Sequence, residues 1–399
     1  MAMPLEGIRV LDWTCFQQGP TVTTLLADMG ADVIKIEPPE GEPARGMLRI
    51  LGIDMPMDFY YQAPNRGKRG IVLDFGKEAA RDVLYKLVEK SDVFVTNYRY
   101  VVAKKLNLDY ETLSKYNPKL VYVLSSGYGM LGKDADLPSA DFAGQSRGGI
   151  CSTTRADDGM PAAAGAGLAD AMGGFCGAYS AMLGLLAKQR TGMGQMVEAS
   201  LLGGATQIVR LWLQRYLMSG EIATGSVFND VGNPLWNLYQ CRDEKWLVIS
   251  VSEPDKYWHQ FCDILGIQEL ERNPRFENAA ARREHLDEIL PRVREIMRTK
   301  SRNEWLDTFS KAGIAAAPVN DMADLMADSQ ARAMNYILDF DDPDYGKVTL
   351  PVILVELSKT PGKVTRLAPQ LGQHTEEVLM EVLGYSWDDI AKIREEGVY

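Results

Sequence analysis

Between residues 8 and 124, short apolar segments alternate with amphipathic stretches, and this alternation restricts the fold more than any other feature. Residues 8–13 (IRVLDW) and 33–36 (VIKI) are expected to be strands, with a helix from Gly19-Pro20 to about Met29 between them. Further strands are expected at 70–74, 93–96 and 120–124, with helices near 77–90 and around Leu113. Such repeats give parallel strands joined by right-handed crossovers. The sequence therefore predicts an α/β fold, a Rossmann-like doubly wound parallel sheet.

The 399 residues are enough for two or three domains. We expect a large α/β domain over 1–224, a second, smaller α+β lobe over 225–335, and a C-terminal segment, 336–399, that returns to the large domain. Four patterns support this division: a polar loop, read as a lid, at 225–234; a hairpin of 237–241 and 246–252; charged amphipathic helices up to about 335; and one or two strands at 348–357, weakened at their start by Pro351. We also expect 199–219 to be helical.

Charge and cysteine content exclude several classes of protein. The 54 acidic residues outnumber the 43 basic ones, so the net charge of −11 argues against a nucleic-acid partner. The five cysteines are odd in number and form no CxxC, which argues against a disulfide framework or a zinc site. With only three histidines (His259, His285 and His374), a metal site or a Ser/His/Asp triad has little to be built from. We expect no metal.

The expected cellular location follows from targeting signals that the sequence lacks. The N-terminus has neither the basic nor the apolar region of a signal peptide. No apolar run reaches the ~18 residues that a membrane span needs. We therefore expect a cytoplasmic protein without a membrane partner.

The turn after the first expected strand reads CFQQGP. It lacks the GxGxxG pattern whose glycines let a pyrophosphate approach the backbone. This absence disfavours a nicotinamide-dependent dehydrogenase.

Asp170 is the strongest candidate for covalent chemistry, because histidines are scarce. It lies in the Gly- and Ala-rich stretch 165–195, where small neighbours leave a carboxylate open to a bulky electrophile. The alternative is that Asp170 caps a helix beginning near 171, a position that Asp favours. The two roles are compatible, since a helix N-terminus also stabilises a carboxylate or an oxyanion.

Six phrases, in order along nearly the whole chain, resemble the class III CoA-transferases, the family of formyl-CoA transferase and carnitine CoA-transferase. They are GIRVLDWT…GP…LLADMGADVIKIEPP, NRGKRGIVLDF, SDVFVTNYR, SSGYG, LADAMGGFCGAYSAMLGLL and APQLGQHTEEVL. The resemblance implies that Asp170 is the catalytic aspartate and that it passes through an acyl anhydride and an aspartyl-CoA thioester. It also implies that Gln17 lies near the reacting acyl groups; the alternative is that Gln17 is an ordinary exposed turn residue. No permanently bound cofactor is expected, because coenzyme A enters as a thioester substrate.

The same resemblance, together with the places of basic residues beside the expected strands, suggests a CoA site. Its expected residues are Arg66, Lys68, Arg69, Asn97, Tyr98, Arg99 and Lys105. The carboxyl ends of strands are where open α/β sheets bind ligands. Any one of these cations could instead belong to a solvated face. Pro38 stands where formyl-CoA transferase has an arginine, so that contact is lost or moved.

Two alternatives outside transferase chemistry remain at this point: an acyl-CoA racemase or isomerase, and a non-catalytic CoA-binding protein. Racemases of the same fold use a histidine that Ala140 replaces here, so two-base proton transfer is disfavoured. For a transferase, the resemblance implies an acyl-CoA donor, with succinyl-CoA as our default, and a free carboxylic acid as acceptor. It also implies an interlocked homodimer, although a heterodimer with a paralogue is not distinguished.

Overall fold

The computed structural model describes residues 3–55, 57–154, 159–165, 167–222, 232–352 and 355–399. Contacts divide the chain into two compact units. The first consists of Met1–Cys151, Ala163–Ile222 and Ala333–Tyr399, and the second of Ser152–Ala162 and Ala223–Arg332. Each unit is described by itself.

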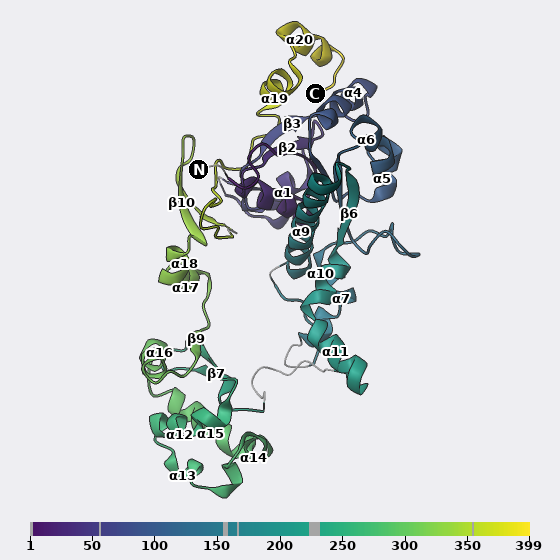
Figure 1. The fold of residues 1–399 in the computed structure, drawn as a ribbon. Coiled ribbons are helices and arrows are strands. Elements are labelled where there is room, and N and C mark those ends of the chain that lie inside the picture. Colours follow the sequence, from purple (N-terminus) through teal and green to yellow (C-terminus); the bar gives the residue numbers. More distant parts are fainter. Residues whose placement is uncertain (1–2, 56, 155–158, 166, 223–231, 353–354) are drawn as a thin grey trace. The chain divides into compact units, whose positions relative to one another are not determined.

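The first unit is built on a six-stranded sheet in which every neighbouring pair is parallel, in the order β3-β2-β1-β4-β5-β6. Strands β2, β3 and β6 of this sheet are labelled in Figure 1. The strands are β1 (Arg9–Trp13), β2 (Asp32–Glu37), β3 (Arg69–Val72), β4 (Val93–Thr96), β5 (Val121–Ser126) and β6 (Gln195–Ser200). The order reverses between β1 and β4, which makes that crevice the topological switch point of the sheet. The predicted doubly wound parallel sheet is confirmed.

Helices cover both faces of this sheet. On one face, α1 (Gln18–Asp28) and α9 (Leu168–Thr191) pack on valines such as Val10, Val95 and Val123. On the other, α4 (Glu78–Glu89) and the C-terminal helices pack on larger side chains. Strands β1 to β5 are buried on both sides, which explains why they contain the apolar runs found in the sequence.

The remaining helices of the first unit are shorter. They are η1 (Pro43–Gly46), α2 (Met47–Leu51), α3 (Phe59–Gln62), α5 (Tyr100–Leu106), α6 (Tyr110–Tyr116), α7 (Asp141–Arg147), α8 (Ile150–Thr153, which extends into the second unit), α10 (Leu201–Ile208), α11 (Arg210–Ser219), α19 (Thr375–Leu383) and α20 (Trp387–Glu395). A two-stranded antiparallel hairpin, β10 (Ile337–Asp342) and β11 (Gly346–Pro351), completes the unit.

Three local expectations differ from the structure. Strand β6 was not predicted, because it is a half-exposed edge strand without an apolar run. The helical stretch expected from 199 begins at Leu201, capped by the Ser200 hydroxyl, and is split at Val209 into α10 and α11. The strand expected at 348–357 is β11, which Pro351 ends rather than begins; residues 353–354 lie outside the described residues.

The second unit contains a three-stranded antiparallel sheet in the order β7-β8-β9. Its elements are β7 (Trp236–Gln240), β8 (Trp246–Ser250), α12 (Pro254–Leu265), α13 (Gln268–Glu271), η3 (Pro274–Phe276), α14 (Ala279–Glu284), α15 (Leu286–Met297), α16 (Arg302–Lys311), β9 (Ala316–Pro318), α17 (Met322–Met326) and α18 (Ser329–Ala333). The predicted hairpin is confirmed as β7 and β8, and β9 is an additional strand. Most of the expected lid, 225–234, lies outside the described residues.

Candidate active site

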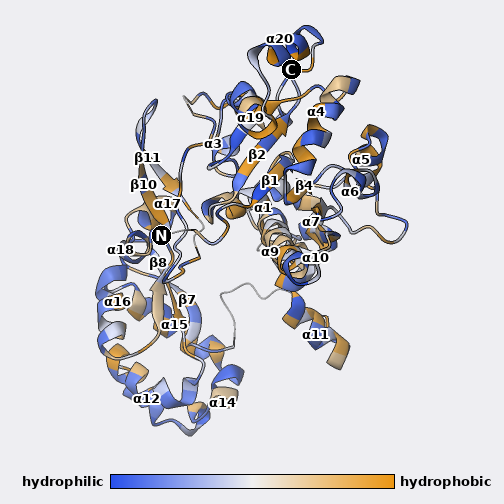
Figure 2. Ribbon diagram, turned by 45° about the horizontal axis from the view of Figure 1, so that its top comes forward, coloured by the Kyte–Doolittle hydropathy of each residue, from blue (hydrophilic) through white to orange (hydrophobic). Residues whose placement is uncertain are grey.

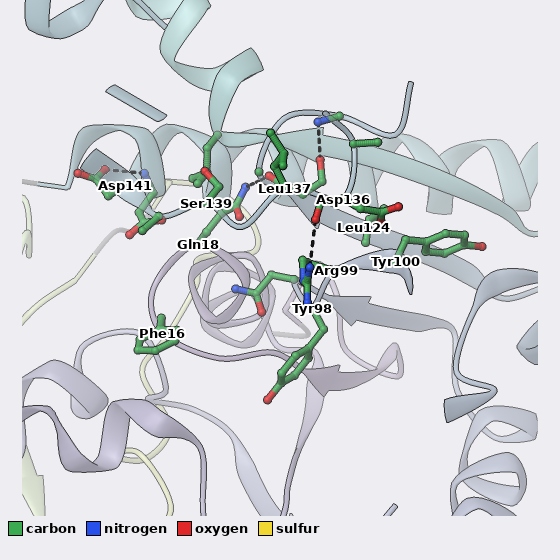
Figure 3. Close-up of a pocket in the computed structure, with 18 of the residues that line it drawn as sticks. Phe16, Gln18, Tyr98, Arg99, Tyr100, Leu124, Asp136, Leu137, Ser139 and Asp141 are labelled. Atoms are coloured by element: carbon green, nitrogen blue, oxygen red, sulfur yellow. Dashed lines mark hydrogen bonds between the residues drawn. The ribbon is translucent and has the colours of Figure 1, made fainter. Parts of the chain in front are cut away.

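A cavity of about 620 Å³ opens at the carboxyl ends of β1, β4 and β5, beside the switch point of the sheet (Figure 3). It is lined by Phe16, Gln18, Tyr60, Asn97, Tyr98, Arg99, Tyr100, Lys104, Leu124, Ser126, Gly127, Gly129, Met130, Ala135, Asp136, Leu137, Ser139, Ala140, Asp141, Phe142, Asp170 and Leu201. Open α/β sheets bind their ligands at this place.

Asp170 lies in the first turn of α9 and faces this cavity. Its side chain is half-buried and, within the described parts of the chain, makes no hydrogen bond to protein. Burial, together with the nearby Asp141 carboxylate, raises the pKa of Asp170 from 3.8 to about 7. Because neither solvent nor protein stabilises its ionised form well, the Asp170 carboxylate is a good nucleophile.

Asp141, rather than Asp170, caps helix α9. Its Oδ1 accepts hydrogen bonds from the backbone N–H groups of Ala169 (2.8 Å) and Asp170 (3.0 Å). Its other oxygen accepts a 2.6 Å hydrogen bond from the buried Gln145 amide, which also binds the backbone of Ala164. The alternative that Asp170 is the N-cap is therefore wrong: the helix begins two residues before it, and Gly167 occupies the cap position with φ of 60°.

Glycines in α9 let this helix lie unusually close to α1. A Cβ atom at Gly173 would come within 2.8 Å of the Gln18 amide, and one at Gly177 would come within 2.5 Å of Val22. Both contacts are shorter than packed atoms tolerate. The small residues around Asp170 therefore serve the close packing that brings the α9 N-terminus to the turn after β1.

The turn after β1 carries two glutamines with different surroundings. Gln18 lines the cavity, and its Nε2 donates to the Ser126 carbonyl oxygen at 3.2 Å. Gln17 borders an adjoining cavity of about 300 Å³. Tyr60 lines both cavities; burial raises the pKa of its hydroxyl, the Asp170 carboxylate adds to the rise, and a hydrogen bond with Gln17 opposes it. Tyr60 therefore lies between the predicted Gln17 and Asp170.

Three of the predicted CoA-site cations are enclosed in ion pairs. Arg66 pairs with Asp28 (2.6 Å), Lys68 with Asp12 (2.8 Å) and Arg69 with Asp32 (2.7 Å), and all three cations are at least 95% buried. None of the three lines the larger cavity, although Arg66 borders the smaller one. Their charges are neutralised inside the fold.

The segment after β4 does reach the cavity. Asn97, Tyr98 and Arg99 all line it, and Tyr98 stacks on Trp13 with ring centroids 4.4 Å apart. Arg99 donates a 3.2 Å hydrogen bond to the Asp136 carbonyl oxygen on the opposite rim (Figure 3). On the helix that follows, Lys104 lines the cavity, whereas the predicted Lys105 is exposed and does not.

Sequence reasoning did not select Gln18, Tyr60, Lys104 or Gln145. Gln18 follows Gln17 directly, so only the start of helix α1 decides which of the two faces the cavity. Tyr60 and Gln145 lie in short helices with no motif of their own.

Cysteine chemistry finds little support in the site. Burial raises the pKa of the Cys15 thiol to about 12, so it stays protonated near neutral pH. The described residues contain no group of three or more His, Cys, Asp or Glu side chains arranged to hold a metal.

Among the helices of the described residues, none is long and apolar enough to cross a membrane.

The sheet order, the cavity at the switch point and the carboxylate that lines it define a doubly wound α/β enzyme. The chain belongs to CoA-transferase family III, whose family model matches residues 5–375, and it is therefore a CoA-transferase. The resemblance suggested by the sequence is confirmed.

Named relatives agree with this family. The chain is 31% identical over 425 residues to formyl-CoA:oxalate CoA-transferase of Rhodopseudomonas palustris (strain BisB18), covering 100% of this chain and 97% of that protein. It is 31% identical over 402 residues to the succinyl-CoA–L-malate CoA-transferase beta subunit of Chloroflexus aurantiacus, covering 99% and 98%. The crystal structure of a CAIB/BAIF family protein from Brucella suis superposes with a TM-score of 0.85 at 30% identity, over 96% of this chain and 100% of that one.

Proposed function

We propose that this protein moves CoA from an acyl-CoA donor to a free carboxylic acid, with Asp170 as the nucleophile. The observation that carries the proposal is the Asp170 carboxylate itself. It faces the cavity, it has no hydrogen-bond partner among the described residues, and its pKa is raised to about 7. At neutral pH a substantial fraction is ionised, and that fraction is poorly stabilised and therefore nucleophilic.

The reaction consists of four acyl transfers. Asp170 attacks the donor thioester carbonyl, and CoA leaves as a thiolate, giving a mixed anhydride. The thiolate attacks the aspartyl carbonyl, which forms an aspartyl-CoA thioester and releases the donor acid as its carboxylate. The acceptor carboxylate then attacks this thioester, giving a second anhydride and CoA thiolate. Finally the thiolate attacks the acceptor's acyl carbon, which yields the new acyl-CoA and the free Asp170 carboxylate.

This sequence requires no proton donor or acceptor, because every attacking group is an anion and every leaving group departs as one. It requires donors for the oxyanion formed at each step. The side-chain amides of Gln17 and Gln18 and the hydroxyl of Tyr60 supply such donors around Asp170. We assign Gln17 to the acyl groups, in agreement with its place beside Tyr60.

CoA binding is assigned to the segment after β4. Asn97, Tyr98 and Arg99 line the cavity, and Lys104 adds a second cation on its wall, with Lys105 exposed nearby. A phosphate-bearing ligand is attracted to such cations. The buried pairs of Arg66, Lys68 and Arg69 support instead a role in holding the sheet edge next to the site.

For the substrates, the names of two relatives give the starting point. One relative is named for formyl-CoA and oxalate, and another for succinyl-CoA and L-malate. We propose succinyl-CoA as donor and leave the acceptor acid to experiment.

We also propose a homodimer, interlocked as the family resemblance implies. Large apolar side chains are exposed along α9 and α11 of the first unit, and Figure 2 shows apolar residues along α11. They are Phe175, Tyr179, Met182, Leu183, Leu186, Leu211, Trp212, Leu213, Tyr216, Leu217 and Met218. Large apolar side chains exposed in such number on two helices support an interface there. Light scattering during size-exclusion chromatography should give twice the mass of the chain.

The test of the activity is detection, by mass, of new acyl-CoA species after mixing the enzyme with succinyl-CoA and a panel of free acids. The panel spans short aliphatic, dicarboxylic, aromatic and hydroxy acids, and the Asp170→Asn variant is the control. A new thioester that requires Asp170 supports the proposal. If CoA binds but no donor, including acetyl-CoA and aromatic thioesters, transfers its CoA, the protein is a non-catalytic CoA-binding protein.

The racemase alternative has its own signature. Ala140 lines the cavity at the position that the resemblance gives to the racemase histidine, so it supplies no base. A racemase would nevertheless exchange the α-proton of an acyl-CoA with solvent. Deuterium appearing at the α carbon in D₂O, without transfer to any acid, would favour that alternative.

A further inference from the structure

The turn between β1 and α1 is held in a conformation that its sequence does not favour. Phe16 has φ of 61°, in the left-handed region that residues other than glycine rarely adopt. Its side chain is 40% exposed and forms part of the wall of the cavity that contains Asp170 (Figure 3). Strained backbone at a ligand cavity persists only where the surroundings fix it.

Asn97 fixes the residue before Phe16. Its Oδ1 accepts the backbone N–H of Cys15 at 2.9 Å, and its Nδ2 donates to the Cys15 carbonyl oxygen at 2.8 Å. The Asn97 side-chain amide thus binds both the backbone N–H and the carbonyl oxygen of Cys15, as a residue on a neighbouring strand would. The start of α1 packs against this contact, since a Cβ atom at Gly19 would lie 2.8 Å from Asn97 and 2.7 Å from Thr14.

Glu42 fixes Phe16 itself. Its Oε2 accepts the Phe16 backbone N–H at 2.7 Å, and its Oε1 pairs with the Lys35 ammonium at 3.0 Å. The same ammonium donates to the Thr14 carbonyl oxygen at 3.0 Å. Glu42 and Lys35 are 2% and 0% exposed. Burying two charges is costly unless their remaining polar contacts are made. Here these contacts go to the turn and, from Glu42 Oε1, to the Asn65 side-chain amide at 3.5 Å.

We propose that Asn97 and Glu42 are positioning residues for CoA transfer, which act through the backbone of Cys15 and Phe16. They hold the turn so that Phe16, Gln17 and Gln18 keep their places around the reacting carbonyl. Asn97 therefore contributes to the reaction through the turn, and its side chain is not primarily a CoA ligand. The proposal rests on the transferase activity proposed above and refines the role of one residue of that site.

The test compares kcat at saturating substrates with CoA affinity measured by calorimetry. Asn97→Ala removes both contacts to Cys15. We expect kcat to fall about 10–100-fold, the range that small misplacement of reacting groups produces, with the Kd for CoA changed less than about threefold. Weaker CoA binding with an unchanged kcat would instead make Asn97 a direct ligand and overturn the proposal.

Two variants of Glu42 distinguish an effect on kcat through positioning from an effect on the overall stability of the protein. Glu42→Gln keeps an oxygen for the Phe16 N–H but loses the ion pair with Lys35, so we expect a lower Tm and a kcat within about threefold of wild type. Glu42→Ala loses both contacts, and kcat should fall about 10–100-fold. If kcat simply follows Tm in the two variants, or if Glu42→Ala keeps full kcat, the proposal is wrong. Glu40→Ala, at an exposed glutamate two residues away, is the matched control and should change neither quantity.

Hydrogen–deuterium exchange of peptides covering residues 14–19 tests the contacts without any activity. Asn97→Ala should expose the Cys15 amide, and Glu42→Ala the Phe16 amide, to faster exchange than in wild type. Unchanged exchange in the variants would refute the contacts even if kcat falls.

If wild-type enzyme transfers no CoA, the proposed function fails, while hydrogen–deuterium exchange still decides whether the turn is held as described. Should Glu42→Ala not fold, Asn97→Ala, at a half-buried residue, carries both measurements.

Discussion

Replacing Asp170 by asparagine should stabilise the protein at alkaline pH while abolishing its activity. Asparagine has nearly the shape of the protonated aspartic acid but cannot ionise. In the folded protein the pKa of Asp170 is raised from 3.8 to about 7, chiefly by burial and secondarily by Asp141. The folded state therefore holds the proton more tightly than the unfolded state does. As pH rises from about 4 to 7, the unfolded chain ionises first and wild type loses stability.

The size of this loss follows from the shift. A rise of about three pKa units corresponds to about 4 kcal/mol at ~1.4 kcal/mol per unit. Because the side chain is only half-buried, solvent screens part of this energy, and we expect about 2 kcal/mol. For a unit of this size, with an unfolding entropy of ~2.1 cal/mol/K per residue, that is about 3–4 °C in Tm. The gain should be complete above about pH 7, smaller at pH 5, and absent where both states are protonated.

The assay is guanidinium unfolding of wild type and Asp170→Asn at pH 5 and pH 8, at equal protein concentration. The variant should be more stable at pH 8, by a margin that shrinks at pH 5. Asp54→Asn, at an exposed aspartate, should show no difference at either pH. A gain that is equal at both pH values, or a variant less stable than wild type at pH 8, would refute the argument that Asp170 is a poorly stabilised carboxylate.

Three further predictions use the same geometry. The nucleophile must be ionised, so kcat/KM should fall about tenfold per pH unit below about pH 7, and a pH-independent kcat/KM down to pH 5 would contradict this. Asp141→Asn keeps an oxygen for the α9 N–H groups but removes the charge beside Asp170, so this acid limb should move to lower pH, and an unmoved limb would show that Asp141 acts only as a cap. Gly177→Ala places a Cβ 2.5 Å from Val22 and should cost about 1–3 kcal/mol in unfolding free energy, whereas Gly165→Ala, in open space, should cost nothing measurable.

The sheet was largely predictable because its strands are buried on both faces. Val10, Val33 and Val95 belong to continuous apolar runs, and such runs survive in the sequence as a clear signal. Strand β6 gives no such signal, because it lies at the edge of the sheet and most of its residues are partly exposed. Its place was decided by pairing with β5, a contact that no local pattern encodes.

The candidate nucleophile could be selected from a local pattern in the sequence. Asp170 stands among glycines, and that neighbourhood pointed to it. The cations were harder to interpret, because Lys68 and Arg69 are neutralised by Asp12 and Asp32, which are distant in sequence. The same holds for the first N–H groups of α9: their acceptor is Asp141, which lies on another helix, so the sequence around Asp170 could not reveal it.

The most direct test of the central claim is to look for the covalent intermediate on Asp170. Enzyme is mixed with succinyl-CoA, treated with borohydride to reduce an aspartyl thioester to the alcohol, and digested for mass analysis of the peptide that contains residue 170. We predict that Asp170 is converted to the alcohol only when acyl-CoA is present, and that the other acidic residues are unchanged. Transfer of CoA without any modification at Asp170, or with full activity in Asp170→Asn, would contradict the mechanism.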